Sequence, residues 1–286
     1  MINRLPAWFK QEIPDETIFE KLEFIRQAKL NSVCKSAHCP NISYCFKSKK
    51  ITFMILGDIC TRHCRFCAVE KNKRSFLPVD KEEPARIAGL VKKWGLNYVV
   101  LTSVTRDDLS DGGASIFART IELIRRLKKN IKIEVLLPDF QGEISSLKTV
   151  INAAVDVVSH NLETVRCLYK DLRIDASYDV SLALLANAKI IKPGLITKSS
   201  LMLGFGETKD EIKGAMEDLR SVNCDILTLG QYLAPSEKHY PVKEFITPVG
   251  FAVYQDMGVS LGFKAVLSGP KVRSSYNAEE LYSKLR

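Results

Sequence analysis

Hydrophobic positions along the chain alternate between short apolar runs and longer amphipathic stretches. Short apolar runs rich in β-branched residues predict buried strands, whereas apolar residues spaced three and four apart predict helices. We expect strands at residues 51–56, 98–101, 131–137, 155–158, 195–203, 226–229 and 265–267. We expect helices at residues 83–94, 113–129, 147–154, 162–169, 179–190, 210–222 and 248–261. Strands and helices therefore alternate from residue 51 onward.

This alternation favours an α/β fold with a parallel sheet, because each strand is followed by a helix that can cross back. Six βα units can be counted from residue 51, fewer than the eight of a closed barrel. We therefore expect a partial (β/α)6 TIM-like barrel with N- and C-terminal extensions that cap the barrel mouth. The expected parts are residues 1–50, the N-terminal extension; 51–268, the barrel; and 269–286, the C-terminal extension.

Composition and charge say more about where the protein resides than about its function. The 286 residues are 46% apolar, enough for a sizeable core, and no apolar run approaches the roughly 20 residues that cross a bilayer. The N-terminus has no apolar signal core, so we expect a cytoplasmic protein without membrane association. A formal charge of +9 suits either a soluble basic protein or one that attracts an acidic partner, such as nucleic acid or an acidic carrier protein.

Three cysteines, Cys60, Cys64 and Cys67, follow the first expected barrel strand with the spacing C-x3-C-x2-C. Three thiolates on one loop can hold three irons of a [4Fe–4S] cluster and leave the fourth iron for a ligand that is not protein. A structural zinc site is the alternative, but the C-x3-C half and the missing fourth ligand argue against it.

Three further cysteines, Cys34, Cys39 and Cys45, precede that strand with the spacing C-x4-C-x5-C. Clustered cysteines in a chain of cytosolic character favour metal over disulfides. Either zinc or a second iron–sulfur cluster would need a fourth ligand from elsewhere. We interpret Cys167 and Cys224 as small buried side chains.

Polar residues gather in the loops that follow the expected strands, where barrels of this kind collect their ligands. An acidic group, Asp107, Asp108 and Asp111, is either a divalent-cation site or a solvated turn. His160 is either a ligand or base, or a hydrogen-bonded structural residue. The candidates for gripping a small charged ligand are Thr102, Ser103, Arg106, Asp107, Asp108, Asn161, Glu163, Lys198, Gly204, Gly206 and Glu207.

Several segments together give the chain a family resemblance. They are the two cysteine trios and residues 53–58, 99–109, 160–164, 229–233 and 273–276, the last reading Arg-Ser-Ser-Tyr. The trio after the first strand resembles the radical SAM superfamily, and the whole combination resembles the lipoyl synthase family within it. The resemblance runs from about Leu5 to the C-terminus.

The resemblance implies a radical SAM sulfurtransferase that inserts sulfur at C6 and C8 of a protein-bound octanoyl group, as part of lipoate biosynthesis. S-adenosylmethionine would bind a cluster on Cys60, Cys64 and Cys67 and yield a 5′-deoxyadenosyl radical. A second [4Fe–4S] cluster would be consumed as the sulfur donor, and its expected ligands are Cys34, Cys39, Cys45 and Ser275. Arg273 and Ser275 are the expected catalytic residues. The expected contacts to S-adenosylmethionine are Thr102, Ser103, Asn161, Glu163 and Lys198.

The implied partners are octanoylated lipoyl-domain proteins, namely E2 subunits of 2-oxoacid dehydrogenases and the glycine-cleavage H protein. An electron donor such as ferredoxin or flavodoxin and a cluster-assembly carrier are also implied, but no nucleic acid or membrane. The alternative enzyme is a biotin-synthase-like or methylthio-transferring protein with an auxiliary cluster. A basic nucleic-acid-binding protein with structural zinc is less favoured, because the sequence has no concentrated Lys/Arg stripe with interleaved aromatic residues.

Overall fold

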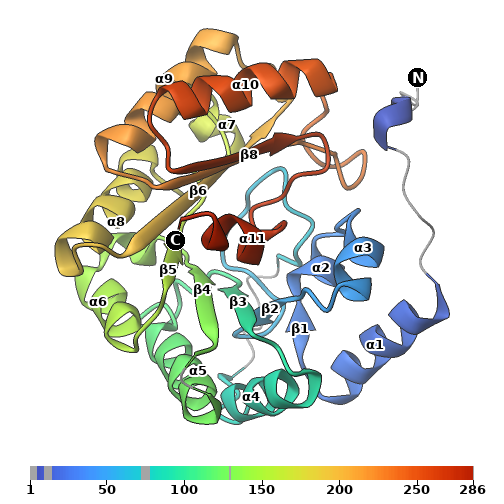
Figure 1. The fold of residues 1–286 in the computed structure, drawn as a ribbon, viewed down its shortest axis with the longest axis vertical. Helices are drawn as coiled ribbons and strands as arrows, with labels where there is room; N and C mark the ends of the chain where they lie inside the picture. Colours follow the sequence, from blue (N-terminus) through green and yellow to red (C-terminus); the bar gives the residue numbers. More distant parts are fainter. Residues whose placement is uncertain (1–4, 10–14, 72–77, 129, 286) are drawn as a thin grey trace.

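The computed structural model describes residues 5–9, 15–71, 78–128 and 130–285, and its centre is a single sheet (Figure 1). The strands follow one another in the sheet in chain order. In the described parts of the chain they are β1 (Asn31–Ser32), β2 (Thr52–Ile55), β3 (Tyr98–Ser103), β4 (Lys132–Leu136), β5 (Val157–Ser159), β6 (Ile196–Leu203), β7 (Ile226–Gln231) and β8 (Ala265–Gly269). β1 pairs antiparallel with β2, and all later neighbours are parallel.

Helices cover the outside of this sheet, one after each strand from β2 to β7 (Figure 1). The principal ones are α4 (Glu83–Trp94), α5 (Ala114–Leu127), α6 (Ile144–Asn152), α8 (Tyr178–Ile191), α9 (Lys209–Ser221) and α10 (Pro248–Ser260), and shorter turns are η2 (Phe140–Gly142), η3 (Arg166–Leu168) and α7 (Tyr169–Leu172). α5 shows why they pack here: Phe117, Ile121 and Ile124 on one face are fully buried. Each such side chain stabilises the fold by about 2 kcal/mol.

The expected fold class is confirmed, because six βα units and a further parallel strand form a partial barrel. The strand order ends at β1 on one edge and β8 on the other, so the sheet stays open. Most expected helices and barrel strands agree closely with the observed bounds. The helix expected at residues 162–169 was placed too early, because residues 162–165 are not helical and the turns η3 and α7 cover residues 166–172. Lys129, the last residue of one expected helix, lies outside the described residues.

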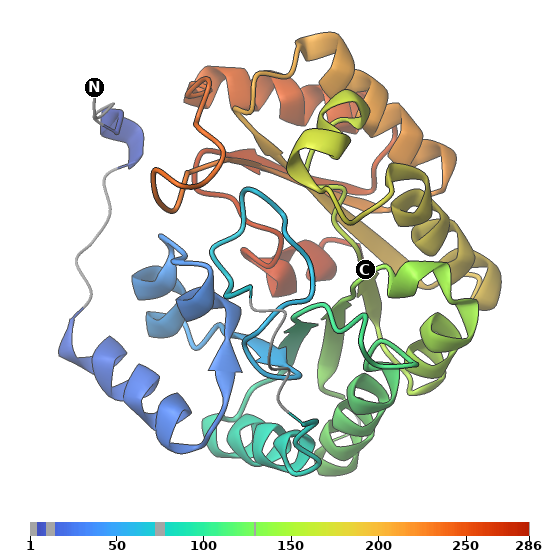
Figure 2. The same ribbon diagram turned by 180° about the vertical axis from the view of Figure 1, so that it is seen from behind.

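Most of the N-terminal extension lies along the β1 edge of the open barrel (Figures 1 and 2). Its first turn, residues 7–9, lies apart from β1, where Phe9 contacts Phe245 in the loop between β7 and α10. The extension comprises η1 (Ala7–Phe9), α1 (Glu16–Gln27), the strand β1, α2 (Val33–Ser36) and α3 (Ile42–Lys47). β1 pairs with β2 through Asn31 opposite Met54 and Ser32 opposite Phe53. This pairing ties the segment that carries the first cysteine trio to the first barrel strand.

The C-terminal extension passes through the barrel interior. Just after β8, the carbonyl carbon and oxygen of Val272 press on Gly230, where a Cβ would lie 1.9 Å from the Val272 oxygen. Only glycine permits this approach. Further along, the Ser274 hydroxyl donates to the Asn161 side chain at 2.9 Å, and Lys50 donates to Asn277 at 2.9 Å.

The extension ends in α11 (Ala278–Ser283), whose position differs from the expected cap over the mouth. Leu281 of α11 packs with Ile226 and Ala265, the residues that begin β7 and β8. α11 therefore covers the amino-terminal end of the barrel, because its apolar side chains meet the apolar starts of the strands. Figure 2, seen from behind, shows the loop that follows β2 on the opposite side from α11.

Candidate active site

The loop that carries Cys60, Cys64 and Cys67 is closed at its base by its own backbone. Ile59 forms a parallel bridge with Glu70, and the Cys60 N–H donates to the Glu70 carbonyl at 2.9 Å. The Cys67 N–H donates to the Cys64 carbonyl at 3.2 Å, which folds the second half of the trio into a tight turn. All three cysteines are free and half-buried, so three thiols face one small region from a single short loop.

Arg62, between the first two cysteines, anchors this loop to its neighbours. Its guanidinium donates to both oxygens of Asp107, at 2.8 and 3.0 Å, and to both oxygens of Asp139, at 2.6 and 2.5 Å. Arg62 and Asp139 are almost completely buried. Burial raises the pKa of Asp139, but hydrogen bonding and charge from Arg62 outweigh it and lower the pKa to about 2.

The three neighbouring carboxylates of Asp107, Asp108 and Asp111 have separate structural roles. Asp107 pairs with Arg62, and Asp108 pairs with Arg106. Asp111 accepts from the N–H groups of Gly113 and Ser115 at the start of α5. The divalent-cation hypothesis is not supported, because these carboxylates point to different protein partners. Among the described residues, no three His, Cys, Asp or Glu side chains converge on a single-ion position. A cubane cluster needs no such convergence, since each cysteine ligates a different iron.

Burial holds two thiols of this loop, those of Cys64 and Cys67, in their neutral form. Burial raises the pKa of Cys64, with Arg173 opposing, and raises that of Cys67 to about 12. Iron must therefore displace a proton from each of these two sulfurs when it binds. A donor set of three soft thiolates from one loop suits an iron–sulfur cluster.

Buried polar atoms without protein partners collect at the carboxyl ends of β3 and β5. They include Ser103 Oγ, Ser159 Oγ and His160 Nε2. Buried polar groups are normally satisfied, so such atoms indicate a polar ligand or water. Ser103 is one of the expected S-adenosylmethionine contacts, and its neighbour Thr102 instead donates to the Leu136 carbonyl at 3.0 Å.

Asn161 and Glu163 lie beside these atoms and are joined to the C-terminal extension. The Asn161 amide donates to Glu163 at 2.9 Å and accepts from the Ser274 hydroxyl at 2.9 Å. Glu163 has a left-handed backbone, with φ 68°, and burial raises its pKa while Arg173 opposes. Two expected cofactor contacts are thereby linked to the segment that carries Ser275.

The structure places Lys198 away from where we expected it. We expected its ammonium among the ligand contacts at the mouth, but it lies within β6 and is fully buried. It forms an ion pair with Glu134 of β4 at 2.8 Å, and Glu134 also accepts from the Tyr98 hydroxyl at 2.7 Å. Because Glu134 already neutralises this charge, the geometry gives it a structural role inside the barrel.

The histidine and the two isolated cysteines have distinct surroundings. The His160 ring donates through Nδ1–H to the Leu137 carbonyl, 2.8 Å away, and burial lowers its pKa to about 4. His160 is therefore neutral at physiological pH. Cys224 is buried as expected, whereas the expectation for Cys167 was wrong: it is exposed and donates to Glu211.

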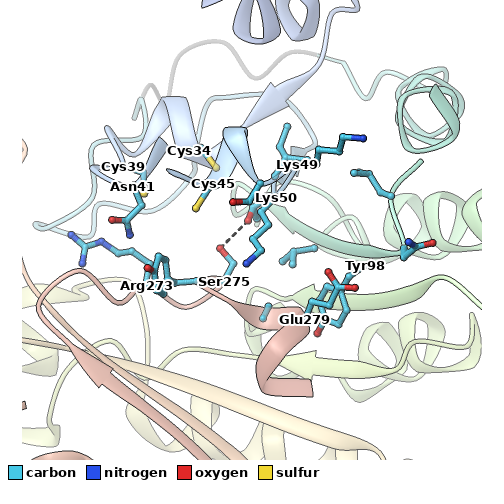
Figure 3. Close-up of a pocket in the computed structure, with 18 of the residues that line it drawn as sticks. Cys34, Cys39, Asn41, Cys45, Lys49, Lys50, Tyr98, Arg273, Ser275 and Glu279 are labelled. Carbon is cyan, nitrogen blue, oxygen red and sulfur yellow. Dashed lines mark hydrogen bonds between the residues drawn. The ribbon is translucent and has the colours of Figure 1, made fainter. Parts of the chain in front are cut away.

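The second trio lines a cavity of about 230 Å³ between the two extensions (Figure 3). Cys34 lies on α2 and Cys45 on α3, with Cys39 in the turn between them. Figure 3 shows these sulfurs on one side of the cavity, with Ser275 and Arg273 on the other. The cavity therefore joins residues from opposite ends of the chain.

Hydrogen bonds hold the walls of this cavity together. The Ser275 Oγ accepts from the Thr52 hydroxyl at 2.8 Å, and the Asn41 amide donates to the Lys271 carbonyl at 2.6 Å. The Cys34 N–H is capped by Ser32 Oγ at 3.1 Å. Thr52 begins β2, so the position of Ser275 is fixed against the barrel itself.

Burial again dominates the electrostatics. It raises the pKa of Cys39, where Cys34 adds to the effect and Arg273 opposes it, and raises that of Cys45 to about 12. Burial lowers the pKa of Arg273, which Cys39 and Glu163 counteract. A buried cation next to three thiols is stabilised when those thiols become thiolates, which suits a negatively charged cluster.

Two arginines of the site were missed by sequence reasoning. Arg62 lies inside the C-x3-C spacing, but nothing local shows that its partners are on other loops. Arg173 donates to the Asn161 carbonyl at 2.9 Å and faces the first trio, although it follows the separate helix α7. Only the fold brings these side chains together.

Comparison with known families first defines the class. The sequence pattern of the radical SAM superfamily matches residues 54–219, which contain the Cys60 trio and most of the barrel. Among solved structures, methylornithine synthase PylB has a TM-score of 0.57 at 15% identity and covers 75% of this chain and 69% of its own. The hydrogenase maturase HydG of Carboxydothermus hydrogenoformans has a TM-score of 0.59 at 14% identity, covering 81% and 65%. These likenesses show the fold.

Full-length relatives then define the family. The lipoyl synthase of Caldanaerobacter subterraneus is 50% identical over 279 residues, which is 98% of this chain and 97% of that protein. The chloroplastic lipoyl synthase of Arabidopsis thaliana is 47% identical over 98% of this chain and 72% of its own. The chain belongs to the lipoyl synthase family of radical SAM enzymes.

Proposed function

We propose that this enzyme inserts two sulfur atoms, at C6 and C8, into an octanoyl group carried on a lysine of a lipoyl domain. The observation that carries this proposal is the cavity shared by Cys34, Cys39, Cys45 and Ser275, because it adds a second cluster site to the radical SAM barrel. A radical SAM enzyme with one cluster has no evident internal source of sulfur.

The residues present suit both groups of the family, namely two [4Fe–4S] clusters and S-adenosylmethionine. When bound, these groups supply a carbon-centred radical at the first site and sulfur at the second. Cys60, Cys64 and Cys67 would hold the first cluster. The unsatisfied polar atoms at the ends of β3 and β5 support binding of S-adenosylmethionine beside it.

The protein's own residues position and shield these groups. Arg62 anchors the first cysteine loop to Asp107 and Asp139, which lie on two other loops. Arg273 provides a buried positive charge next to Cys39. The chain of contacts from Ser274 through Asn161 to Glu163 couples the two sites.

Ser275 would complete the second cluster through its hydroxyl oxygen. An oxygen ligand is harder than a thiolate and suits iron–sulfur iron less well. Thr52 already donates to this oxygen and would stabilise it as an alkoxide. A weak fourth ligand is consistent with a cluster that is taken apart during the reaction.

The finer partners are also proposals. E2 subunits and the glycine-cleavage H protein would supply the octanoylated domain, ferredoxin or flavodoxin the electrons, and a cluster-assembly carrier the replacement cluster. We propose the cytoplasm as the site of action, although the Ricinus communis relative is named chloroplastic. No helix among the described residues is long and apolar enough to cross a membrane.

Anaerobic turnover with an octanoyl-lysine peptide, S-adenosylmethionine and reductant tests the proposal by mass spectrometry. The expected product carries two sulfurs, and 5′-deoxyadenosine accompanies it. The matched control is Cys45→Ala, which should still form 5′-deoxyadenosine but no sulfur-containing product. Cleavage of S-adenosylmethionine without thiolation by the wild-type enzyme would contradict the proposal.

A further inference from the structure

A second hollow adjoins the cavity of the Cys34 trio and is surrounded by lysines. It measures about 180 Å³ and is lined by Lys21, Phe46, Lys49, Lys50, Lys93 and Trp94. Lys49 and Lys50, which are labelled in Figure 3, also line the trio cavity, so the two hollows share these side chains. We call Lys21, Lys49, Lys50 and Lys93 the lysine rim.

The charges of the lysine rim are largely uncompensated. Lys50 is paired with Glu280, and Glu279 lines the neighbouring cavity. Lys21 donates to the Phe46 carbonyl at 2.7 Å, and Lys93 lies over the Phe24 ring at 3.8 Å. Within the described residues, no acidic side chain forms an ion pair with any rim lysine other than Lys50. The rim therefore presents a net positive surface.

The rim also offers apolar contact. Trp94 lines the same hollow and is partly exposed, whereas Phe46 is buried. The aliphatic stems of the long lysine side chains add apolar surface while their ammonium groups stay in water. A macromolecular partner would find apolar area at the centre and positive charge around it. This combination is typical of a docking surface rather than of a site for a small ion.

The position of the rim restricts what docks there. An octanoyl chain can enter the trio cavity, but the folded domain that carries it is too large and must stay outside its opening. Lys49 and Lys50 line both hollows, so a side chain that reaches the trio cavity from the rim passes them. A domain with acidic residues around its octanoyl-lysine would be steered there by charge.

We propose that the lysine rim docks an acidic face of the octanoylated lipoyl domain, so that the octanoyl-lysine arm enters past Lys49 and Lys50. This inference rests on the proposed function and adds the surface by which the substrate protein is recognised. A cluster-assembly carrier is a different partner for the same opening. The more economical occupant is the substrate domain, because every catalytic event requires its arm to reach the sulfur-donating cavity.

The test uses the holoenzyme with both clusters and the triple variant Lys21→Glu/Lys49→Glu/Lys93→Glu. Single-turnover rates are measured against the concentration of an acidic octanoylated lipoyl domain and, separately, of a short octanoyl-lysine peptide with uncharged flanks. The half-saturating domain concentration should rise by about tenfold or more at low salt, as for the loss of close charge pairs. The same quantity for the peptide should stay unchanged.

The matched control reverses three exposed lysines elsewhere, Lys148→Glu/Lys170→Glu/Lys209→Glu, on α6, α7 and α9. This control changes the net charge by the same amount as the rim variant. A local effect of the rim therefore requires a larger rise in the half-saturating domain concentration in the rim variant than in the control. Equal half-saturation in both triple variants would overturn the proposal. It would also be overturned if the rim variant weakened only repeated turnover with a cluster carrier, which would assign the rim to the carrier. Failure of the wild-type enzyme to thiolate either substrate would instead refute the proposed function.

Discussion

Arg62 makes the most specific prediction, because one side chain joins three loops. Replacing it in Arg62→Met leaves Asp139 buried without its hydrogen-bonded cation, while Asp107 is 25% exposed and can recover water. Removing one partner of a buried ion pair costs about 3–5 kcal/mol of unfolding free energy. We expect a loss in this range for the protein without clusters, measured by urea denaturation under reducing conditions.

Asp139→Asn separates charge from geometry. The asparagine can still accept from Arg62, and Asp107 keeps Arg62 paired. The pKa of Asp139 is lowered from 3.8 to about 2, which corresponds to about 2 kcal/mol at neutral pH. Since the folded-state pKa is the lower one, this stability is present above about pH 3.8 and is lost as the pH falls through about 2.

The control is Arg119→Met, which breaks an exposed pair with Glu122 at 3.7 Å on α5. Exposed pairs contribute about 0–1 kcal/mol, so this variant should unfold almost like the wild type. A second readout follows the cluster: Arg62→Met should alter the electron paramagnetic resonance signal that the first reduced cluster gives with S-adenosylmethionine. An unfolding free energy of Arg62→Met within about 1 kcal/mol of that of Arg119→Met would refute the reasoning. Such a small difference would mean that the substitution does not leave Asp139 as an unpaired buried charge.

Three further variants test other parts of the account. Burial raises the pKa of Glu83 to about 7, although its carboxylate accepts from the Leu56 N–H, so the unfolding free energy should fall by about 3 kcal/mol between pH 4.5 and 7. Glu83→Gln should flatten this pH profile in denaturation titrations. An unchanged slope would assign the pH dependence to another group. In Gly230→Ala the added methyl group would collide with the Val272 carbonyl and displace the C-terminal extension. The iron content, measured anaerobically, should therefore fall from about eight to about four irons per chain. A full iron content would show that the extension tolerates the shift. Ser275→Cys should retain the second cluster with a stronger ligand and impair sulfur transfer, and full lipoyl production by this variant would exclude a role for the weak oxygen ligand.

The barrel could be predicted from the sequence because each of its elements has its own period. α5 carries an apolar stripe and β2 an uninterrupted buried run, and both signals are local. β1, α2 and α3 were not predicted. A two-residue strand and helices of four and six residues are too short to show a period.

The cysteine trios could be recognised in the sequence because, like the periods of the barrel elements, their spacing is local. Lys198 was misplaced because its partner Glu134 lies on another strand, and only the parallel register brings the two together. α11 was expected at the mouth because sequence does not show that the C-terminal extension crosses the interior beside Gly230. Arg173 was missed since its contact with the Asn161 carbonyl depends on how the chain returns after α7.

The central claim is that the cavity of Cys34, Cys39, Cys45 and Ser275 holds the sulfur source. It is tested most directly by rebuilding the clusters with heavy-isotope sulfide and running a single turnover in excess ordinary sulfide. Mass spectrometry of the product should find two heavy sulfurs in the lipoyl group, because both come from the protein-bound cluster. A product that contains only ordinary sulfur from solution would contradict the account.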